Sequence, residues 1–372
     1  MKVKFLAVVL AMGLPGAVQQ SFAQKQYDIP VQTSAHSESQ AAEVAAPEGC
    51  ADGQSGTCEE EQCGDCETYS CVDPSYQPCW RFYGDFLFLR ARDTEVPYAV
   101  PIDGPIGNPF VAQAGRVVSV DPDYEPGFRI GGSFMLDCDA ALSAQYTWWR
   151  SDTEDAVSVL EPLVLRSLVS SPAIENADSD GLDAAASYDI EFQLADIDYR
   201  SVFYSNGRTS LTWLAGVSYA HLEEDFVSVF GVNGLNIVES NVQFDGAGIR
   251  LGLEAERYAR NCGLLLYGRS SARFVAGEFD ADYFQGEVPG DPVQIDTGWD
   301  AGRIVSILDL ELGIGWQSCD GCLRLTGGYM VSGWFNTVST ADWIAGVQAN
   351  DFGDLDDTIS FDGFTARAEV RW

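Results

Sequence analysis

The sequence is poor in the residues on which most enzymes and nucleic-acid-binding proteins depend. It contains two histidines, His36 and His221, and three lysines, Lys2, Lys4 and Lys25. Its formal net charge is −35 at pH 7, which disfavours nucleic acid or an anionic membrane surface as a partner because both repel an acidic chain. Beyond the first segment it lacks any run of about 18 to 20 apolar residues, so no transmembrane helix is predicted. If this protein crosses a membrane, it therefore crosses as strands.

The first 23 residues have the pattern of a secretory signal peptide. Lys2 and Lys4 precede an apolar run at residues 5–14, and small residues follow at Ser21 and Ala23. We predict that residues 1–23 are removed on export, which places the mature protein in an oxidising compartment.

The next part of the chain is too polar to form an ordinary core. Residues 24–49 have few bulky apolar side chains and are predicted to be a flexible, disordered linker. Residues 50–79 form a cysteine-rich segment, predicted to be periplasmic. In an exported chain such cysteines favour disulfides, and the candidates, including two beside a later turn, are Cys50, Cys58, Cys63, Cys66, Cys71, Cys79, Cys319 and Cys322. The spacing does not choose among pairings, and a structural zinc site at Cys63 and Cys66 is the alternative.

From Trp80 onward, polar and apolar residues alternate with the period of a β-strand. In the closing segment, residues 359–372, Phe364 and Val370 lie on one face, whereas Arg367 and Glu369 lie on the other. About ten such segments are predicted, at residues 80–92, 125–136, 140–152, 187–204, 208–221, 241–258, 263–279, 303–317, 322–335 and 359–372.

The connections between these segments alternate in length. Tight turns, two of them with Asn-Gly or Asp-Gly pairs, are predicted at residues 205–208, 260–263 and 319–322. Long loops are predicted near residues 93–124, 153–186, 223–240, 280–300 and 336–358. Short turns on one rim and long loops on the other are typical of outer-membrane barrels. We therefore predict an all-β fold for residues 80–372: a single antiparallel transmembrane β-barrel of about ten strands (about 8 to 12), with short periplasmic turns and long extracellular loops.

Several stretches of this part resemble a known family. They are FYGDFLFLRAR from Phe82, YEPGFRIGGSFMLDCDAALSAQYTWWRSD from Tyr124, IDYRSVF from Ile197, DLELGIGW from Asp309 with LTGGYMVSGWFN after it, and FDGFTARAEVRW at the end of the chain. Through them the chain resembles the Legionella major outer-membrane-protein family, which also has cysteine-bearing planctomycete members. The resemblance implies a pore-forming barrel in the outer membrane. It does not explain the cysteine-rich tail, whose role stays open.

The polar faces of the strands are predicted to line the lumen. The candidate pore-lining residues are Arg129, Gln145, Arg250, Glu254, Glu256, Arg269, Arg273, Asp309, Glu311, Arg324, Arg367, Glu369 and Arg371. Charged side chains at these positions set ion preference in wide pores, and they also pair and fill narrow ones. Ten strands predict a constricted or plugged lumen. We expect passive diffusion of small hydrophilic solutes or ions.

Two other functions are open from the sequence. One is a structural or adhesive barrel, with acidic loops outside and a disulfide-tethering tail. The other is a hydrolase active at the rim, for which His221 beside Glu223, Glu224 and Asp225 is the candidate base, although no recognisable nucleophile lies near it.

The expected partners are outer-membrane lipid and lipopolysaccharide, and small solutes or ions. A homo-oligomer or disulfide-linked neighbours are further alternatives. No cofactor and no metal are predicted: loop carboxylates such as Asp121, Asp123, Asp178, Asp180, Asp280, Asp282, Asp354, Asp356 and Asp357 are taken as solvated charge, with calcium binding as the alternative. Two loop stretches, residues 156–169 and 340–350, are too apolar for plain solvent loops. Three arrangements are open for each: it folds into the lumen, forms an extra hairpin, or caps the barrel from outside.

Overall fold

The computed structural model describes residues 80–104, 112–137, 139–173, 181–206, 208–231, 235–259, 263–288, 293–318, 322–353 and 355–371. All of them belong to one compact unit, residues 62–372. The predicted signal peptide, linker and cysteine-rich segment lie outside the described residues. So do all the disulfide candidates except Cys322, which is exposed, and the pairing therefore stays a prediction.

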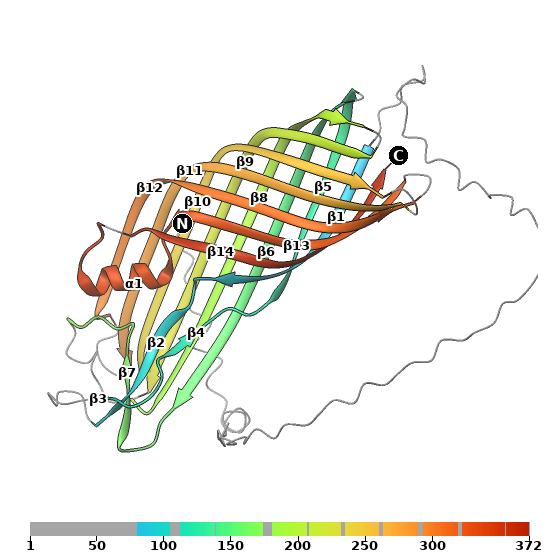
Figure 1. The fold of residues 1–372 in the computed structure, drawn as a ribbon. Helices are drawn as coiled ribbons and strands as arrows, with labels where there is room; N and C mark the ends of the chain where they lie inside the picture. The colour runs from blue at the N-terminus through green and yellow to red at the C-terminus, as the bar shows by residue number, and fades with distance from the viewer. Residues whose placement is uncertain are drawn as a thin grey trace, which may run out of the picture. The chain divides into compact units, whose positions relative to one another are not determined.

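Ten strands form a closed antiparallel barrel (Figure 1). They are β1 (Trp80–Arg92), β5 (Glu125–Asp137), β6 (Ala140–Ser158), β8 (Asp183–Ser205), β9 (Thr209–Gly231), β10 (Leu235–Tyr258), β11 (Leu264–Val288), β12 (Ile295–Gln317), β13 (Leu323–Thr337) and β14 (Asp357–Arg371). Neighbouring strands follow one another along the chain, and β1 closes the barrel by pairing with both β14 and β5. The predicted fold class is thus confirmed.

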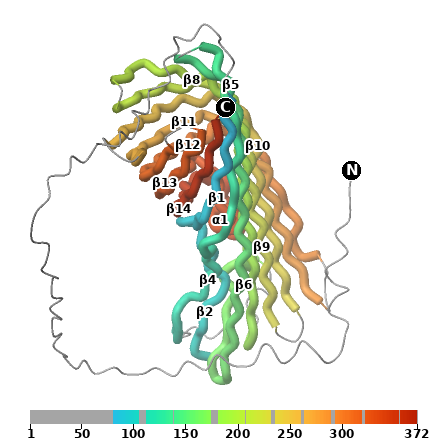
Figure 2. Tube along the Cα trace, turned by 90° about the vertical axis from the view of Figure 1, so that its right-hand side faces the viewer, coloured from blue at the N-terminus to red at the C-terminus, as the bar shows by residue number. Residues whose placement is uncertain are grey.

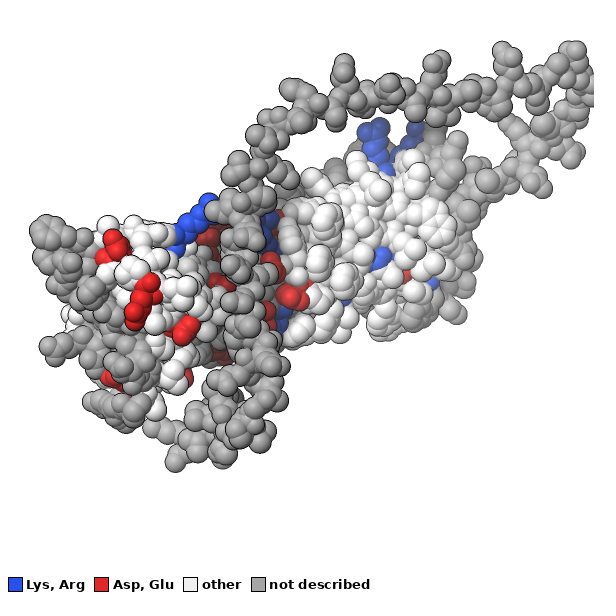
Figure 3. Space-filling view, turned by 90° about the horizontal axis from the view of Figure 1, so that it is seen from below, with Lys and Arg blue, Asp and Glu red and all other residues white. Residues whose placement is uncertain are grey.

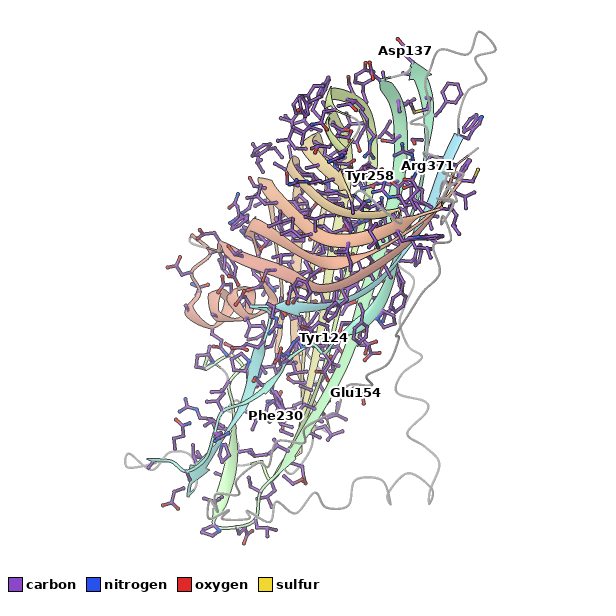
Figure 4. The ribbon with its side chains drawn as sticks, turned by 45° about the vertical axis from the view of Figure 1, so that its right-hand side comes forward. Tyr124, Asp137, Glu154, Phe230, Tyr258 and Arg371 are labelled. Carbon is purple, nitrogen blue, oxygen red and sulfur yellow. The ribbon has the colours of Figure 1, made fainter. Side chains whose placement is uncertain are left out.

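The two rims differ, although less than predicted. Short turns join the strands at the end near the C-terminus, where Asp137, Tyr258 and Arg371 lie, whereas Glu154 and Phe230 lie towards the opposite end (Figure 4). At that opposite, extracellular end, the connection from β1 to β5 contains β2 (Val96–Asp103), β3 (Ala112–Gln113) and β4 (Val118–Val120). Together with β7 (Leu163–Ser167), these form a small second sheet, and Figure 2 shows β2 and β4 at the end away from the C-terminus. The stretch 156–169 therefore contributes an extra strand rather than a solvent loop.

The prediction of long loops is wrong at two places, where the structure has strands. Residues 223–240 are mostly strand, with β9 ending at Gly231 and β10 beginning at Leu235, and residues 280–300 are mostly the paired ends of β11 and β12. The strands β8 to β12 are consequently 23 to 25 residues long. A tilted transmembrane strand needs only about 9 to 11 residues, so more than half of each of these strands extends outside the bilayer.

In each long strand, the face that carries the apolar residues changes from one side to the other along the strand. On β8, the outward residues near the periplasmic end are apolar, such as Ile197 and Tyr199, while Asp196 and Asp198 point inward. Towards the extracellular end the outward positions carry charge, such as Glu191, and Phe192 is inside. We call the first part the membrane region and the second the extracellular region. The same inversion follows from the burial patterns of β9, β10, β11 and β12.

Solvent explains the inversion. Lipid favours apolar residues outside and allows charge only inside, whereas water favours charge outside and requires an apolar interior. In Figure 3 one part of the visible surface is almost free of charge, and the other carries most of the acidic groups. In the extracellular region, Asp152, Asp189, Asp225, Asn241 and Asp282 form one row across five neighbouring strands.

Candidate functional site: the barrel interior

Paired charges fill the interior of the membrane region. Nine arginines and eight carboxylates form ion pairs there: Arg81, Arg129, Arg200, Arg250, Arg269, Arg273, Arg324, Arg367 and Arg371 with Asp85, Asp196, Asp198, Glu254, Glu256, Asp309, Glu311 and Glu369. They come from nearly every strand of the barrel. The alternation of each strand directs them into the lumen, because the other face of the strand meets lipid.

Every charged residue that the sequence predicted to line the pore belongs to this network. Arg367 binds both carboxylate oxygens of Asp85, at 2.6 and 2.7 Å, and Arg324 donates to Glu256 at 2.7 Å. Gln145, the one uncharged candidate, donates to Asp196 at 2.7 Å. The structure thus brings the predicted residues together as partners.

Some of these bonds cross the lumen. Arg129 on β5 lies 3.3 Å from Glu311 on β12, although three strands separate them on the shorter path round the wall. Arg273 on β11 donates to Asp196 on β8 at 2.9 and 3.1 Å and also binds Asp309. A buried charge is stable only when it is paired and hydrogen-bonded, and each charged group of the network has a partner of opposite charge.

The alternation also contained charges that the prediction missed. Arg81 and Asp85 on β1 occupy the same face of the strand, as do Asp196, Asp198 and Arg200 on β8. Successive inward positions of a strand are separated by one outward residue, so period two was sufficient to find them. They supply the acids that hold Arg367, Arg250 and Arg273.

Above the charges, aromatic side chains meet across the barrel. We call Trp149, Phe192, Trp334 and Phe361 the aromatic layer. Phe192 on β8 and Trp334 on β13 lie on opposite walls, with four strands between them on either side, and their ring centroids are 5.8 Å apart. Phe361 lies 4.7 Å from Phe192 and 5.4 Å from Trp149. The aromatic layer therefore spans the lumen and narrows it at the boundary with the extracellular region.

A helix covers the extracellular end of the lumen. The helix α1 (Thr340–Ala349) lies in the connection between β13 and β14, with Trp343 and Ile344 buried. Figure 1 shows it at the end opposite the C-terminus. The stretch 340–350 thus forms a helix with a buried face, one of the inward-folding segments proposed from its apolar sequence.

The histidine considered as a catalytic base faces away from the lumen. The Nδ1 atom of His221 lies 3.0 Å from Asp245 and its Nε2 atom 3.6 Å from Glu223, on the outer surface of β9 and β10. Glu224, its predicted neighbour, points into the barrel and is fully buried. The set proposed from the sequence is therefore split between two sides of the wall.

The described residues hold neither a metal-binding cluster nor a membrane-spanning helix. Among the described residues, no group of three or more His, Cys, Asp or Glu side chains is arranged to hold a metal ion. A pocket of about 1170 Å³ is lined mainly by outward residues of the membrane region, such as Phe82, Ile130, Ile197 and Val217. Its lining also includes the inward residues Tyr83, Asp196 and Ser218. No helix in the described part of the chain has the length and apolar character of a membrane span.

The sequence matches a family model over almost the whole barrel. The family model of the Legionella pneumophila major outer membrane protein precursor matches residues 72–370. The chain belongs to this family. As a member of the Legionella major outer-membrane-protein family, it is an outer-membrane protein, and its apolar belt is the surface that meets the lipid. A search of curated proteins found no match.

Solved barrels resemble this family member only distantly. The outer membrane protease OmpT from Escherichia coli shares 9% identity, covers 82% of this chain and 99% of its own, and has a TM-score of 0.46. The toluene transporter TodX from Pseudomonas putida shares 12% identity over 78% of this chain and 68% of its own, with a TM-score of 0.31. At these values, neither likeness bears on activity.

Proposed function

We propose that the protein is a pore-forming protein of the outer membrane that passes ions or small hydrophilic solutes. The observation that carries this proposal is the ring of ionised groups on the interior wall at bilayer depth. Several of them keep access to solvent: the exposed fraction is 18% for the side chain of Asp309, 21% for Glu256 and 26% for Arg371. Arginine and carboxylate groups at such positions interact with ions of both signs, so we expect weak charge selectivity.

The aromatic layer makes this pore a narrow one. Rings that touch across the lumen leave passage only when they move apart. Side chains change rotamer and collective motions open barriers on timescales from nanoseconds to milliseconds. We therefore expect low conductance with brief openings rather than a permanently open channel.

Planar-bilayer conductance of the refolded protein tests this proposal. The double variant F192A/W334A removes two rings that meet across the lumen and should raise conductance several-fold. The matched control is F364A, which removes an aromatic ring from the lipid-facing side of β14, where it is 63% exposed, and should leave conductance unchanged. Absence of conductance in both the wild type and the double variant would refute a pore.

The second candidate function is structural. Ion pairs and aromatic contacts that span the lumen favour a rigid, filled barrel whose acidic extracellular region faces the cell's surroundings. In that case the double variant would be less stable but would still not conduct. Reducible multimers on non-reducing gels would support the proposed disulfide tethering to neighbours.

A further inference from the structure

The helix α1 lies in an insertion that the barrel does not need for closure. The strands β13 and β14 are already paired at Thr337 and Asp357, immediately before and after the connection that contains α1. From there the helix reaches β9, which lies opposite β14 with four strands between them on either side, and Thr340 bonds to Glu224 on β9. The indole nitrogen of Trp343 donates to the carbonyl of Asp282 on the nearer strand β11 at 3.1 Å. The helix therefore crosses the lumen instead of lining it.

Glu224 is unlike the carboxylates of the membrane region. It is fully buried, yet among the described residues no arginine, lysine or histidine lies within ion-pair distance of it. One of its oxygens, Oε2, accepts three hydrogen bonds instead. The donors are the hydroxyl of Tyr188 at 2.8 Å, the backbone N–H of Thr340 at 2.8 Å and the hydroxyl of Thr340 at 2.7 Å.

Two of these three donors belong to the first residue of α1. Ser339 caps the helix by accepting from the backbone N–H of Asp342 at 3.3 Å. A helix N-terminus presents unpaired N–H groups and a partial positive charge, which favours an anion beside it. The first turn of α1 thus has, for Glu224, the role that an arginine has for the carboxylates of the membrane region.

The rest of α1 is held more weakly. Besides the bond from Trp343, Gln348 donates to the carbonyls of Leu168 and Ser170 at 2.7 and 3.0 Å. These bonds join uncharged groups, which are about half as strong as bonds to an ionised acceptor. Glu224 is therefore the strongest single polar attachment between α1 and the barrel wall.

The attachment of Glu224 also carries a cost. Burial raises the pKa of Glu224 above its usual range, against the effect of the hydrogen bonds from Thr340. Its second oxygen, Oε1, is buried without a hydrogen-bond partner among the described residues. The free-energy cost of burying the charge offsets part of the stabilisation from its hydrogen bonds. An attachment with a small net stabilisation is one that can be released.

We propose that α1 is a plug over the extracellular end of the lumen and that Glu224 is the latch that holds it there. Release of the latch exposes the buried face of the helix, formed by Trp343 and Ile344, to the surrounding medium. The effect of release on solute passage rests on the proposed pore function. The latch itself does not, and it is tested separately.

Thiol labelling measures release directly. A cysteine is introduced at Ile344, which is 3% exposed, and the refolded protein is treated with a hydrophilic maleimide in lipid vesicles. Mass spectrometry of the peptide that contains residue 344 separates its labelling from that of the native cysteines. We expect I344C to be labelled slowly and I344C/E224A about 10- to 100-fold faster, the range for loss of a hydrogen bond to a charged group.

Two further variants make the result specific. E223A, in the I344C background, removes the adjacent acid that faces outward on the same strand and should leave the rate unchanged. T340V, in the same background, removes only the hydroxyl donor and should give an intermediate labelling rate. Heat-modifiable migration on gels shows whether each variant folds. If E224A does not fold, the labelling rate of T340V tests the latch in its place. Equal labelling rates for I344C, I344C/T340V and any folded I344C/E224A would overturn the latch. Faster labelling without any rise in conductance would leave the latch standing and count against the pore.

Discussion

Each of the eight interior carboxylates of the membrane region lies beside at least one arginine. Such pairs repay the cost of removing two charges from water only when the geometry is good, and breaking one leaves an uncompensated charge. Individual residues in the lumen should therefore differ sharply from similar residues on the outer surface. The predictions at this scale use that contrast.

Arg273 should be among the most sensitive residues of the network. Its side chain is 2% exposed and pairs with Asp196 and Asp309. R273A should lower the free energy of unfolding by about 3 to 5 kcal/mol, measured by urea unfolding in micelles. The control is R150A, whose arginine is 48% exposed beside Asp189 and should cost about 0 to 1 kcal/mol. Equal losses in the two variants would contradict the buried network.

Glu224 should give the barrel a pH-dependent stability. Because burial raises its pKa in the folded state, the folded protein binds the proton more tightly than the unfolded chain, whose carboxyl has a pKa of about 4.3. The contribution to stability is then fully present below about pH 4.3 and is lost as the pH rises through the folded-state pKa. Tyr188 faces the carboxyl from β8, Thr340 from α1, and Asp357 adds negative charge.

The variant E224Q isolates this effect, because it removes the titrating group and keeps an acceptor oxygen. The stability of the wild type relative to E224Q should decrease between pH 4 and pH 8 in urea unfolding experiments. A difference that stays constant over this range would show that Glu224 does not bind a proton more tightly in the folded state.

At the scale of elements, the strands were predictable where they cross the membrane and less so beyond it. The bounds of β1 were predicted to the residue, at Trp80–Arg92. The outer ends of β9 to β12 were assigned to loops, because their charged residues follow the opposite phase. The sequence does contain this change of face. On β8 the apolar residues occupy odd positions at Ile197 and Tyr199 and even positions at Phe192 and Leu194. The contacts across the lumen could not be predicted, because they depend on which walls of the closed barrel face each other.

Close strand packing makes one glycine position much less tolerant than another. A Cβ atom at Gly363 on β14 would lie 2.0 Å from the carbonyl oxygen of Phe88 on β1, whereas a Cβ at Gly84 on β1 meets no atom within 4 Å. G363A should cost about 1 to 3 kcal/mol, as overpacking does, and G84A should be within about 0.5 kcal/mol of the wild type. Urea midpoints of the two variants check this, and equal midpoints would contradict the register of β1 with β14.

At the scale of the whole molecule, the barrel is divided between two solvents. The membrane region has charge inside and apolar residues outside, and the extracellular region has the reverse. The acidic composition of the chain is explained by this division, because its outer wall beyond the bilayer carries rows of carboxylates. A net charge of −35 is thus compatible with insertion in a membrane.

Fluorescence quenching along one strand tests this division most directly. A fluorophore is attached to single cysteines at outward positions 296, 300, 304, 308, 312 and 316 of β12, in a background whose native cysteines are replaced by serine, and the protein is reconstituted in brominated lipid. Quenching should be strong at 304, 308 and 312, where Ile304, Leu308 and Leu312 are 48 to 58% exposed. It should be weak at Asp296 and Asp300. Uniform quenching from 296 to 316, or none at 308, would contradict the account.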